Sequence, residues 1–290
     1  MSGAVTTGAL RSVLLSSRPL SWINTAYPFA AAYLLRAREV DAALVVGTVF
    51  FLVPYNLLMY GINDVFDYES DRRNPRKGGV EGALLDTRWH RLTLLAAVLV
   101  PLPFVVALVA LGSPASWLVL ALSLFAVVAY SAPRLRFKER PGLDSLTSST
   151  HFVTPALYGL VLADRGVGGG AWTVLAAFFC WGVASQAFGA VQDIGADRRA
   201  GIASVATALG ARATVRLSLA CYAVAGLLLL AAPWPAPLAA PLVLPYLVMA
   251  WPYRALADAD AEAAHRGWRH FLWLNYAVGS LVTMLLIWRG

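Results

Sequence analysis

The chain has 290 residues, of which 59% are hydrophobic and only 13% are charged, and its mean hydropathy is +0.64. Because a soluble domain of this length would carry roughly 25% charged residues, the composition excludes an ordinary soluble protein and indicates an integral membrane protein. The formal net charge of +7 is expected for loops beside anionic lipids, so we expect no nucleic-acid partner. Cys180 and Cys221 lie within apolar segments and predict neither a disulfide nor a zinc site.

Apolar segments long enough to cross a bilayer, which takes about 20 residues, follow one another along the chain. We predict an all-α membrane protein with nine transmembrane helices, at about 20–35, 42–63, 92–111, 115–132, 144–163, 171–190, 213–231, 236–253 and 270–288. Pro28, Pro54, Pro155 and Pro245 fall inside these segments. Packed membrane helices tolerate such prolines because neighbouring groups satisfy the freed carbonyl.

Lys and Arg residues concentrate in alternate loops of this nine-helix arrangement. Only four of the 23 basic residues fall in one set of loops, Arg36, Arg38, Arg165 and Arg289, and the others lie in the set that includes the N-terminus. Because cytoplasmic loops carry an excess of basic residues, we predict a cytoplasmic N-terminus and a C-terminus outside the cell membrane.

Two acidic motifs follow the second and the sixth predicted helix, both on the predicted cytoplasmic side. The first contains Asn63, Asp64, Asp67 and Asp71, and the second contains Gln192, Asp193 and Asp197. On a helix these spacings place the carboxylates of each motif on one face. Close carboxylates repel one another, and a hard divalent cation cancels that charge. Mg²⁺ commonly binds through a few carboxylates and a substrate phosphate, so we expect a membrane enzyme that acts on a diphosphate.

The matching positions of the motifs suggest an internal duplication within a single domain. The predicted halves are residues 1–143 and 144–269, each with four helices, followed by a ninth helix at 270–288. A basic stretch follows each motif, at 72–77 and at 198–199. If the halves pack about a pseudo-twofold axis, the two motifs would face each other across a central cavity.

Transfer of a prenyl group from its diphosphate breaks a C–O bond, and negative charge builds up on the leaving group. Mg²⁺ held by the five aspartates would neutralise that charge. The predicted diphosphate-binding residues are cations and one amide near the motifs: Asn63, Arg72, Arg136, Lys138, Arg198 and Arg199. Arginine suits this role because its planar fork matches pairs of phosphate oxygens. The remaining allylic cation needs a dry apolar or aromatic chamber.

Several polar residues within apolar segments admit two interpretations. Asn24 and Gln186 either line the substrate cavity or bond a neighbouring helix. Tyr130 is either an interfacial tyrosine or a proton acceptor in the reaction, and the diphosphate itself could also accept that proton. Asn63 and Gln192, each directly before the first aspartate of its motif, either orient ligands or end a helix.

At these residues the chain resembles the UbiA superfamily of intramembrane prenyltransferases. The resemblance covers nearly the whole chain: Arg18-Pro19 before the first helix, the Asn63 to Asp71 motif, Tyr130-Ser131-x-Pro133 with Arg136 and Lys138, and Asp193 to Gly201 continuing to Leu209-Gly210. The resemblance implies nine helices around a central cavity, Mg²⁺ dependence, and a lateral opening to the lipid bilayer for the acceptor.

Residues 17–30 and 60–71 further resemble the bacterial lycopene elongases of this superfamily. The resemblance implies dimethylallyl diphosphate as donor, lycopene as acceptor, C45 and C50 carotenoids as products and a bacterial plasma membrane as location. Some of these enzymes also add water. The sequence leaves open whether a partner carotenoid cyclase acts on the product.

Three alternatives remain open. Prenylation of a quinone precursor or another lipid would call for a polar partner within the cavity, and the predicted helices offer little beyond Asn24, Gln186 and His151. A membrane CDP-alcohol phosphotransferase would gather its acids into one tight motif, whereas this chain divides them between two. A secondary transporter usually places its coupling acids near the bilayer midplane, whereas these lie at predicted cytoplasmic helix ends.

Overall fold

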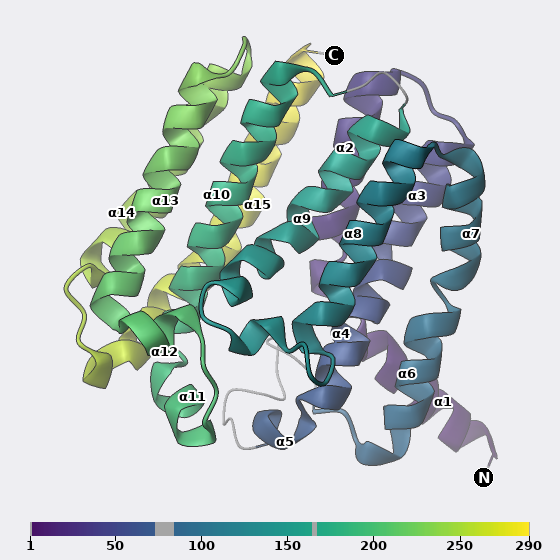
Figure 1. Cartoon of the computed structure of the whole chain (residues 1–290), viewed down its shortest axis with the longest axis horizontal. Helices are drawn as coiled ribbons and strands as arrows, with labels where there is room; N and C mark the ends of the chain where they lie inside the picture. Colours follow the sequence, from purple (N-terminus) through teal and green to yellow (C-terminus); the bar gives the residue numbers. More distant parts are fainter. Residues whose placement is uncertain (1, 73–83, 164–166, 290) are drawn as a thin grey trace. The chain divides into compact units, whose positions relative to one another are not determined.

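A computed structural model describes residues 2–72, 84–163 and 167–289. Within these ranges every element is an α-helix or a 3-10 helix (Figure 1), which confirms the all-α prediction. Most of the basic stretch at 72–77, from Arg73 to Lys77, lies outside the described residues, as does Arg165.

Seven helical segments of the described chain are long and apolar enough to cross a membrane, which confirms a multi-pass membrane protein. They are Ala42–Phe66, Thr87–Leu111, Pro114–Ser131, Gly169–Val191, Ala211–Ala231, Ala236–Tyr253 and Asp258–Trp288. The predicted spans at 20–35 and 144–163 are not among them. Helix α2 (Ile23–Ala37) has only 15 residues, and α9 (Leu143–Leu162) carries Asp, Ser, Thr and His in its first half. The number nine and the central cavity therefore stay predictions.

The chain forms two compact units. The first comprises residues 1–136 and 154–166, and the second comprises residues 137–153 and 167–290. Helix α9 contributes to both units, since the division falls between Val153 and Thr154.

The helices of the first unit surround a core of buried aromatic rings. They are α1 (Ser2–Ser16), η1 (Pro19–Ser21), α2, α3 (Ala42–Leu52), α4 (Pro54–Phe66), α5 (Tyr68–Asp71), η2 (Thr87–Trp89), α6 (His90–Leu99), α7 (Leu102–Leu111), α8 (Pro114–Ser131) and the end of α9. Phe29, Phe50, Phe51, Tyr55 and Tyr158 are each 0% exposed. Their ring centroids lie 4.9 to 6.0 Å apart in the contacting pairs, within the range of favourable aromatic packing.

Proline divides two of the predicted spans of this unit into pairs of helices. Pro54 separates α3 from α4 because proline has no N–H to donate to the preceding turn. Asn56 lies beside this break: its Nδ2 donates to the carbonyl of Phe51 at 2.9 Å and to Thr25 Oγ1 at 2.7 Å. The span predicted at 92–111 likewise divides into α6 and α7 next to Pro101.

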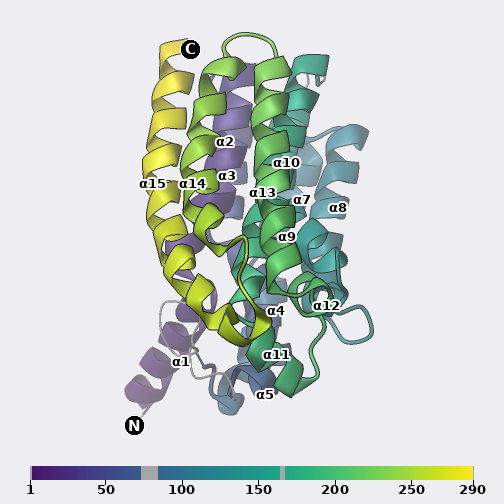
Figure 2. The same ribbon diagram turned by 90° about the vertical axis from the view of Figure 1, so that its left-hand side faces the viewer.

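The second unit consists of the start of α9 and a set of long helices after it. Its elements are η3 (Phe137–Glu139), α10 (Gly169–Val191), α11 (Ile194–Ala200), α12 (Val205–Leu209), α13 (Ala211–Ala231), η4 (Ala236–Val243), α14 (Leu244–Ala250), η5 (Trp251–Tyr253), η6 (Asp258–Ala263) and α15 (Ala264–Arg289). Figure 2 shows α13 beside α10 and α14 beside α15.

Small residues let α15 approach α10 closely. A Cβ on Gly189 of α10 would lie 2.8 Å from the Trp268 ring, and a Cβ on Gly267 of α15 would lie 2.8 Å from the Phe188 ring. This contact brings the start of α15 to the end of α10, where the second acidic motif begins.

Candidate functional site: two acidic clusters at helix ends

The first acidic cluster lies at the end of α4, and Asp64 is its most buried carboxylate. The side chain of Asp64 is 1% exposed, and its Oδ1 accepts a hydrogen bond from Arg18 Nη2 at 3.0 Å. The guanidinium of Arg18 also stacks 4.4 Å from the centroid of the Tyr60 ring. Burial alone would lower the pKa of Arg18, but the charge and hydrogen bond of Asp64 outweigh it and raise that pKa. Arg18 therefore stays charged opposite Asp64.

Asp67 and Asn63 are each contacted from the end of α8 or the turn after it. Asp67 ends α4 as its C-cap residue, and its Oδ1 lies 3.7 Å from Nη2 of Arg136. Asn63 Oδ1 accepts a hydrogen bond from Ser131 Oγ at 2.9 Å. Arg136 has a left-handed backbone conformation (φ 39°), which a non-glycine residue adopts at a cost. The structure thus brings Asn63, Asp67 and Arg136 together, as a shared site requires.

Asp71 and Arg72 mark the outer edge of this cluster. Asp71 ends the single turn of α5 and is partly exposed. Arg72 is exposed and lies 3.5 Å from Glu69, three residues before it, a surface pair that stabilises little. Tyr130 is partly buried in the last turn of α8, next to Ser131.

The second acidic cluster begins where α10 ends. Gln192 is the C-cap of α10, Asp193 is the N-cap of the short helix α11, and Asp197 lies in its first turn. The backbone N–H of Asp197 donates to the carbonyl of Asp193 at 2.8 Å, so the two residues are one helical turn apart. That their carboxylates share one face stays a prediction. Both residues are partly exposed.

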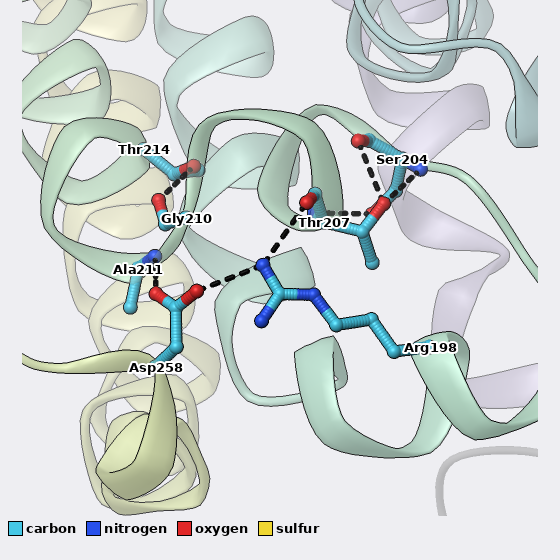
Figure 3. Close-up of polar contacts among 7 residues, drawn as sticks. All are labelled: Arg198, Ser204, Thr207, Gly210, Ala211, Thr214 and Asp258. Carbon is cyan, nitrogen blue, oxygen red and sulfur yellow. Dashed lines mark hydrogen bonds and ion pairs between the residues drawn. The ribbon is translucent and has the colours of Figure 1, made fainter.

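Arg198, predicted to bind diphosphate, is engaged by protein groups in this structure. Its Nη2 lies 2.8 Å from Oδ2 of Asp258 and donates to the carbonyl of Thr207 at 3.1 Å (Figure 3). The next residue, Arg199, is exposed. Lys138, in η3, is partly buried.

The two predicted cavity residues have different surroundings. Gln186 is partly buried in α10, and its Oε1 accepts a hydrogen bond from Ser148 Oγ of α9 at 3.0 Å. Asn24 is exposed at the start of α2. Gln186 thus bonds a neighbouring helix, which is one of the two interpretations that its sequence allowed.

The donors of both clusters fit a hard cation in type and charge. Asp64 and Asp67 are buried carboxylates that face arginines, and carboxylate oxygens are the ligands that Mg²⁺ prefers. Across the described ranges, no group of three or more Asp, Glu, His or Cys side chains is arranged to hold a metal by itself. A complete set of protein ligands is not needed, because Mg²⁺ commonly binds one or two carboxylates and completes its coordination shell with water and substrate phosphates.

Four residues of these clusters were absent from the predicted site. Arg18 and Ser131 contact the first motif, and Asp258 and His265 contact the second. Arg18 could have been suspected, because it stands beside the first predicted span in a mostly apolar chain. Ser131 belongs to the Tyr130-Ser131-x-Pro133 string that carries the resemblance, whereas Asp258 and His265 carry no comparable signal.

Comparison with known proteins shows similarity over nearly the full length. The profile of the UbiA prenyltransferase family matches residues 25–275. The chain is 57% identical over 284 residues to the C(50) beta-cyclic carotenoids biosynthesis protein LbtBC of Dietzia sp., covering 98% of this chain and 66% of that protein. It is 54% identical over 278 residues to the lycopene elongase/hydratase of Corynebacterium glutamicum, covering 96% and 97%.

The fold is also similar to solved structures. A UbiA homolog from Archaeoglobus fulgidus bound to GPP and Mg²⁺ superposes with a TM-score of 0.68 at 19% identity, covering 93% of this chain and 99% of that one. The same homolog bound to DMAPP and Mg²⁺ gives a TM-score of 0.67. At this identity the likeness concerns the fold.

Proposed function

Because the chain belongs to the UbiA prenyltransferase family, we propose that it transfers the five-carbon group of dimethylallyl diphosphate to lycopene, giving C45 and C50 carotenoids. The observation that carries this proposal is the identity of 54% over 96% of the chain with a lycopene elongase/hydratase, which itself is covered over 97% of its length. The acceptor follows from that relative's name, and the donor from the five-carbon steps between lycopene and a C50 product.

The aspartates of the two clusters are proposed to hold Mg²⁺. These are Asp64, Asp67 and Asp71 in the first unit and Asp193 and Asp197 in the second. When bound, Mg²⁺ neutralises the charge that develops on the leaving diphosphate. Arg18 lies 3.0 Å from Asp64 and Arg136 lies 3.7 Å from Asp67, and these opposite charges reduce the cost of burying the two carboxylates.

Diphosphate is proposed to bind to Asn63, Arg72, Arg136, Lys138, Arg198 and Arg199. Arg136 is the best placed of these, because it already lies 3.7 Å from Asp67 and its fork can bind two phosphate oxygens together. The C–O bond of the donor breaks, and its electron pair leaves with the diphosphate. A terminal alkene carbon of lycopene then forms the new C–C bond.

The reaction is completed by loss of a proton or by addition of water. We propose Tyr130 as proton acceptor, since it lies in the last turn of α8 beside Ser131, whose hydroxyl bonds Asn63. Asn24 and Gln186 are proposed to line the acceptor cavity, Gln186 while its Oε1 is bonded to Ser148 of α9. Lycopene carries no polar group to anchor, which agrees with the few polar side chains along the apolar helices.

The proposed location is the plasma membrane of a bacterium, with a cytoplasmic N-terminus, a C-terminus outside and the active site toward the cytoplasm. The basic residues concentrated near both acidic motifs support this orientation. A carotenoid cyclase is the proposed partner, since one relative is named for cyclic C50 carotenoids.

The test is a reconstituted reaction. The purified chain in lipid vesicles is given Mg²⁺, lycopene and either dimethylallyl or geranyl diphosphate, and the products are identified by mass. Lycopene extended by one and two five-carbon units, formed only with the first donor, supports the proposal. Extension of a quinone precursor in parallel vesicles, with lycopene unchanged, would show that the acceptor is wrong.

A further inference from the structure

We propose that Asp258 and His265 are positioning residues that hold the second acidic motif at its two ends. They lie on either side of the start of α15, more than 60 residues after the motif in sequence. The inference rests on the proposed function of that motif, because it concerns how Asp193 and Asp197 are aimed.

The motif needs external support because its own helix is short. Helix α11 has 7 residues and is separated from α10 by a break at Gln192 and Asp193. A helix of this length is marginal by itself, and the Asp193 side chain makes no capping hydrogen bond to it. Contacts with other elements therefore help to hold the segment that carries Asp193 and Asp197.

Asp258 holds the C-terminal end of the motif through Arg198. One carboxylate oxygen lies 2.8 Å from Arg198 Nη2, and the other accepts the backbone N–H of Ala211 at 2.7 Å (Figure 3). A Cβ on Gly210, which has φ +80°, would lie 2.9 Å from Asp258 Oδ1, so this glycine admits the carboxylate. Asp258 thereby joins the residue directly after Asp197 to the first residue of the long helix α13.

His265 holds the N-terminal end of the motif through Gln192. Its Nδ1 lies 2.6 Å from Gln192 Oε1, and Gln192 Nε2 donates to the carbonyl of Gly189 at 3.0 Å. Because an amide oxygen only accepts hydrogen bonds, Nδ1 of His265 is the donor. Gln192 is 5% exposed, so its side chain is fixed on both sides immediately before Asp193.

This arrangement gives Arg198 a defined role. Its Nη2 is bound by Asp258 and Thr207, so Arg198 places Asp197 in addition to its proposed contact with diphosphate. Arg198 and Arg199 are both exposed. Residues that orient metal ligands typically change metal affinity about 10- to 100-fold when they are altered.

The test measures metal binding without turnover. Mn²⁺ serves as a probe for Mg²⁺, and its binding to the purified full chain with inorganic diphosphate is followed by electron paramagnetic resonance. The variants are Asp258→Asn, His265→Leu and His265→Asn, since the asparagine amide can donate to Gln192 as Nδ1 does. Asp260→Asn is the matched control: it makes the same charge change two residues away, at an exposed position.

Asp258→Asn and His265→Leu are expected to weaken Mn²⁺ binding about 10-fold or more, while His265→Asn and Asp260→Asn stay near the parent chain. The double variant Arg198→Gln with Asp258→Asn should bind Mn²⁺ no more weakly than whichever of the two single variants binds it more weakly, because both substitutions remove the same contact. Additive losses in that pair, or parent-like binding in both Asp258→Asn and His265→Leu, would overturn the inference. A parent chain that binds no Mn²⁺ with diphosphate would instead contradict the proposed function.

Discussion

Arg18 and Asp64 form an ion pair of 3.0 Å between residues 46 positions apart, and the aspartate side chain is 1% exposed. A carboxylate this deeply buried is costly unless it is paired and hydrogen-bonded. Arg18 supplies both, and it also stacks on Tyr60. The pair therefore compensates a buried charge at the end of helix α4.

Removing Arg18 alone should destabilise the chain strongly. Arg18→Gln removes the positive charge that lies 3.0 Å from the buried Asp64 carboxylate, and we expect a loss of about 3 kcal/mol in the free energy of unfolding. Thermal unfolding of the purified chain, carried out without metal, measures this loss of stability. Arg18→Gln with Asp64→Asn removes both charges and should recover much of the loss. A double variant no more stable than Arg18→Gln would show that the ion pair is not the cause.

Ser131 should matter through Asn63. Ser131→Ala removes the 2.9 Å hydrogen bond to Asn63 Oδ1. Because Asn63 is proposed to bind the diphosphate whose oxygens complete the Mg²⁺ shell, we expect the Mg²⁺ concentration for half-maximal activity to rise about 10-fold. A Mg²⁺ titration of diphosphate release measures this. Ser280→Ala is the control, because that hydroxyl only bonds the carbonyl of Tyr276 on exposed α15. Equal Mg²⁺ requirements in the two variants would exclude the role of Ser131.

Gly47 should tolerate no larger side chain. A Cβ there would lie 2.1 Å from the Phe29 ring, which is 0% exposed, so Gly47→Ala should lower the free energy of unfolding by about 1 to 3 kcal/mol. Gly279→Ala in α15 meets open space and should be neutral or stabilise by up to about 1 kcal/mol. Thermal unfolding of the two variants measures both changes. An equal loss of stability in Gly47→Ala and Gly279→Ala would contradict the packing argument.

Asp41 should make stability depend on pH at the start of α3. It accepts hydrogen bonds from Tyr33 at 2.6 Å and from the Leu44 N–H at 2.9 Å. The bond from Tyr33 is the largest influence lowering the pKa of Asp41. Because the folded pKa lies below the unfolded value, the stabilisation is complete above about pH 4 and is lost as pH falls through the folded pKa.

Asp41→Asn should remove that pH dependence while keeping an N-cap residue. Asp41→Ala removes the cap and should cost about 1 kcal/mol. Unfolding curves of both variants and the parent between pH 3 and pH 7 test this. If Asp41→Asn kept the parent's loss of stability at acid pH, Asp41 would not be its source.

The features that the sequence predicted are those set by residues close together in the chain. The acidic motifs could be found because the spacing of Asp64, Asp67 and Asp71, and of Asp193 and Asp197, is a local pattern, and the apolar runs predicted most of the spans. Pro101 and Pro54 mark breaks within two of them. Helix α9 (Leu143–Leu162) matches the helix predicted at 144–163, but its first half carries buried polar residues such as Ser149 and His151, and it is not among the candidate membrane spans of the described chain.

Contacts between distant segments could not be predicted. Gln192 and His265 are 73 residues apart, and no periodicity relates one to the other. Asp258 looks from its sequence like any solvated loop acid, and only the fold brings it to Arg198. Ser131 and Asn63 lie 68 residues apart and likewise meet through the packing of α8 on α4.

The most direct test of the central claim is the pigment content of lycopene-accumulating cells that express this chain. We predict carotenoids with the mass of lycopene plus one and two five-carbon units, with or without added water. Asp64→Asn and Asp193→Asn should leave only lycopene, and Asp260→Asn should behave as the parent. Unchanged lycopene with the parent chain, present in the membrane at the level of the variants, would contradict the account.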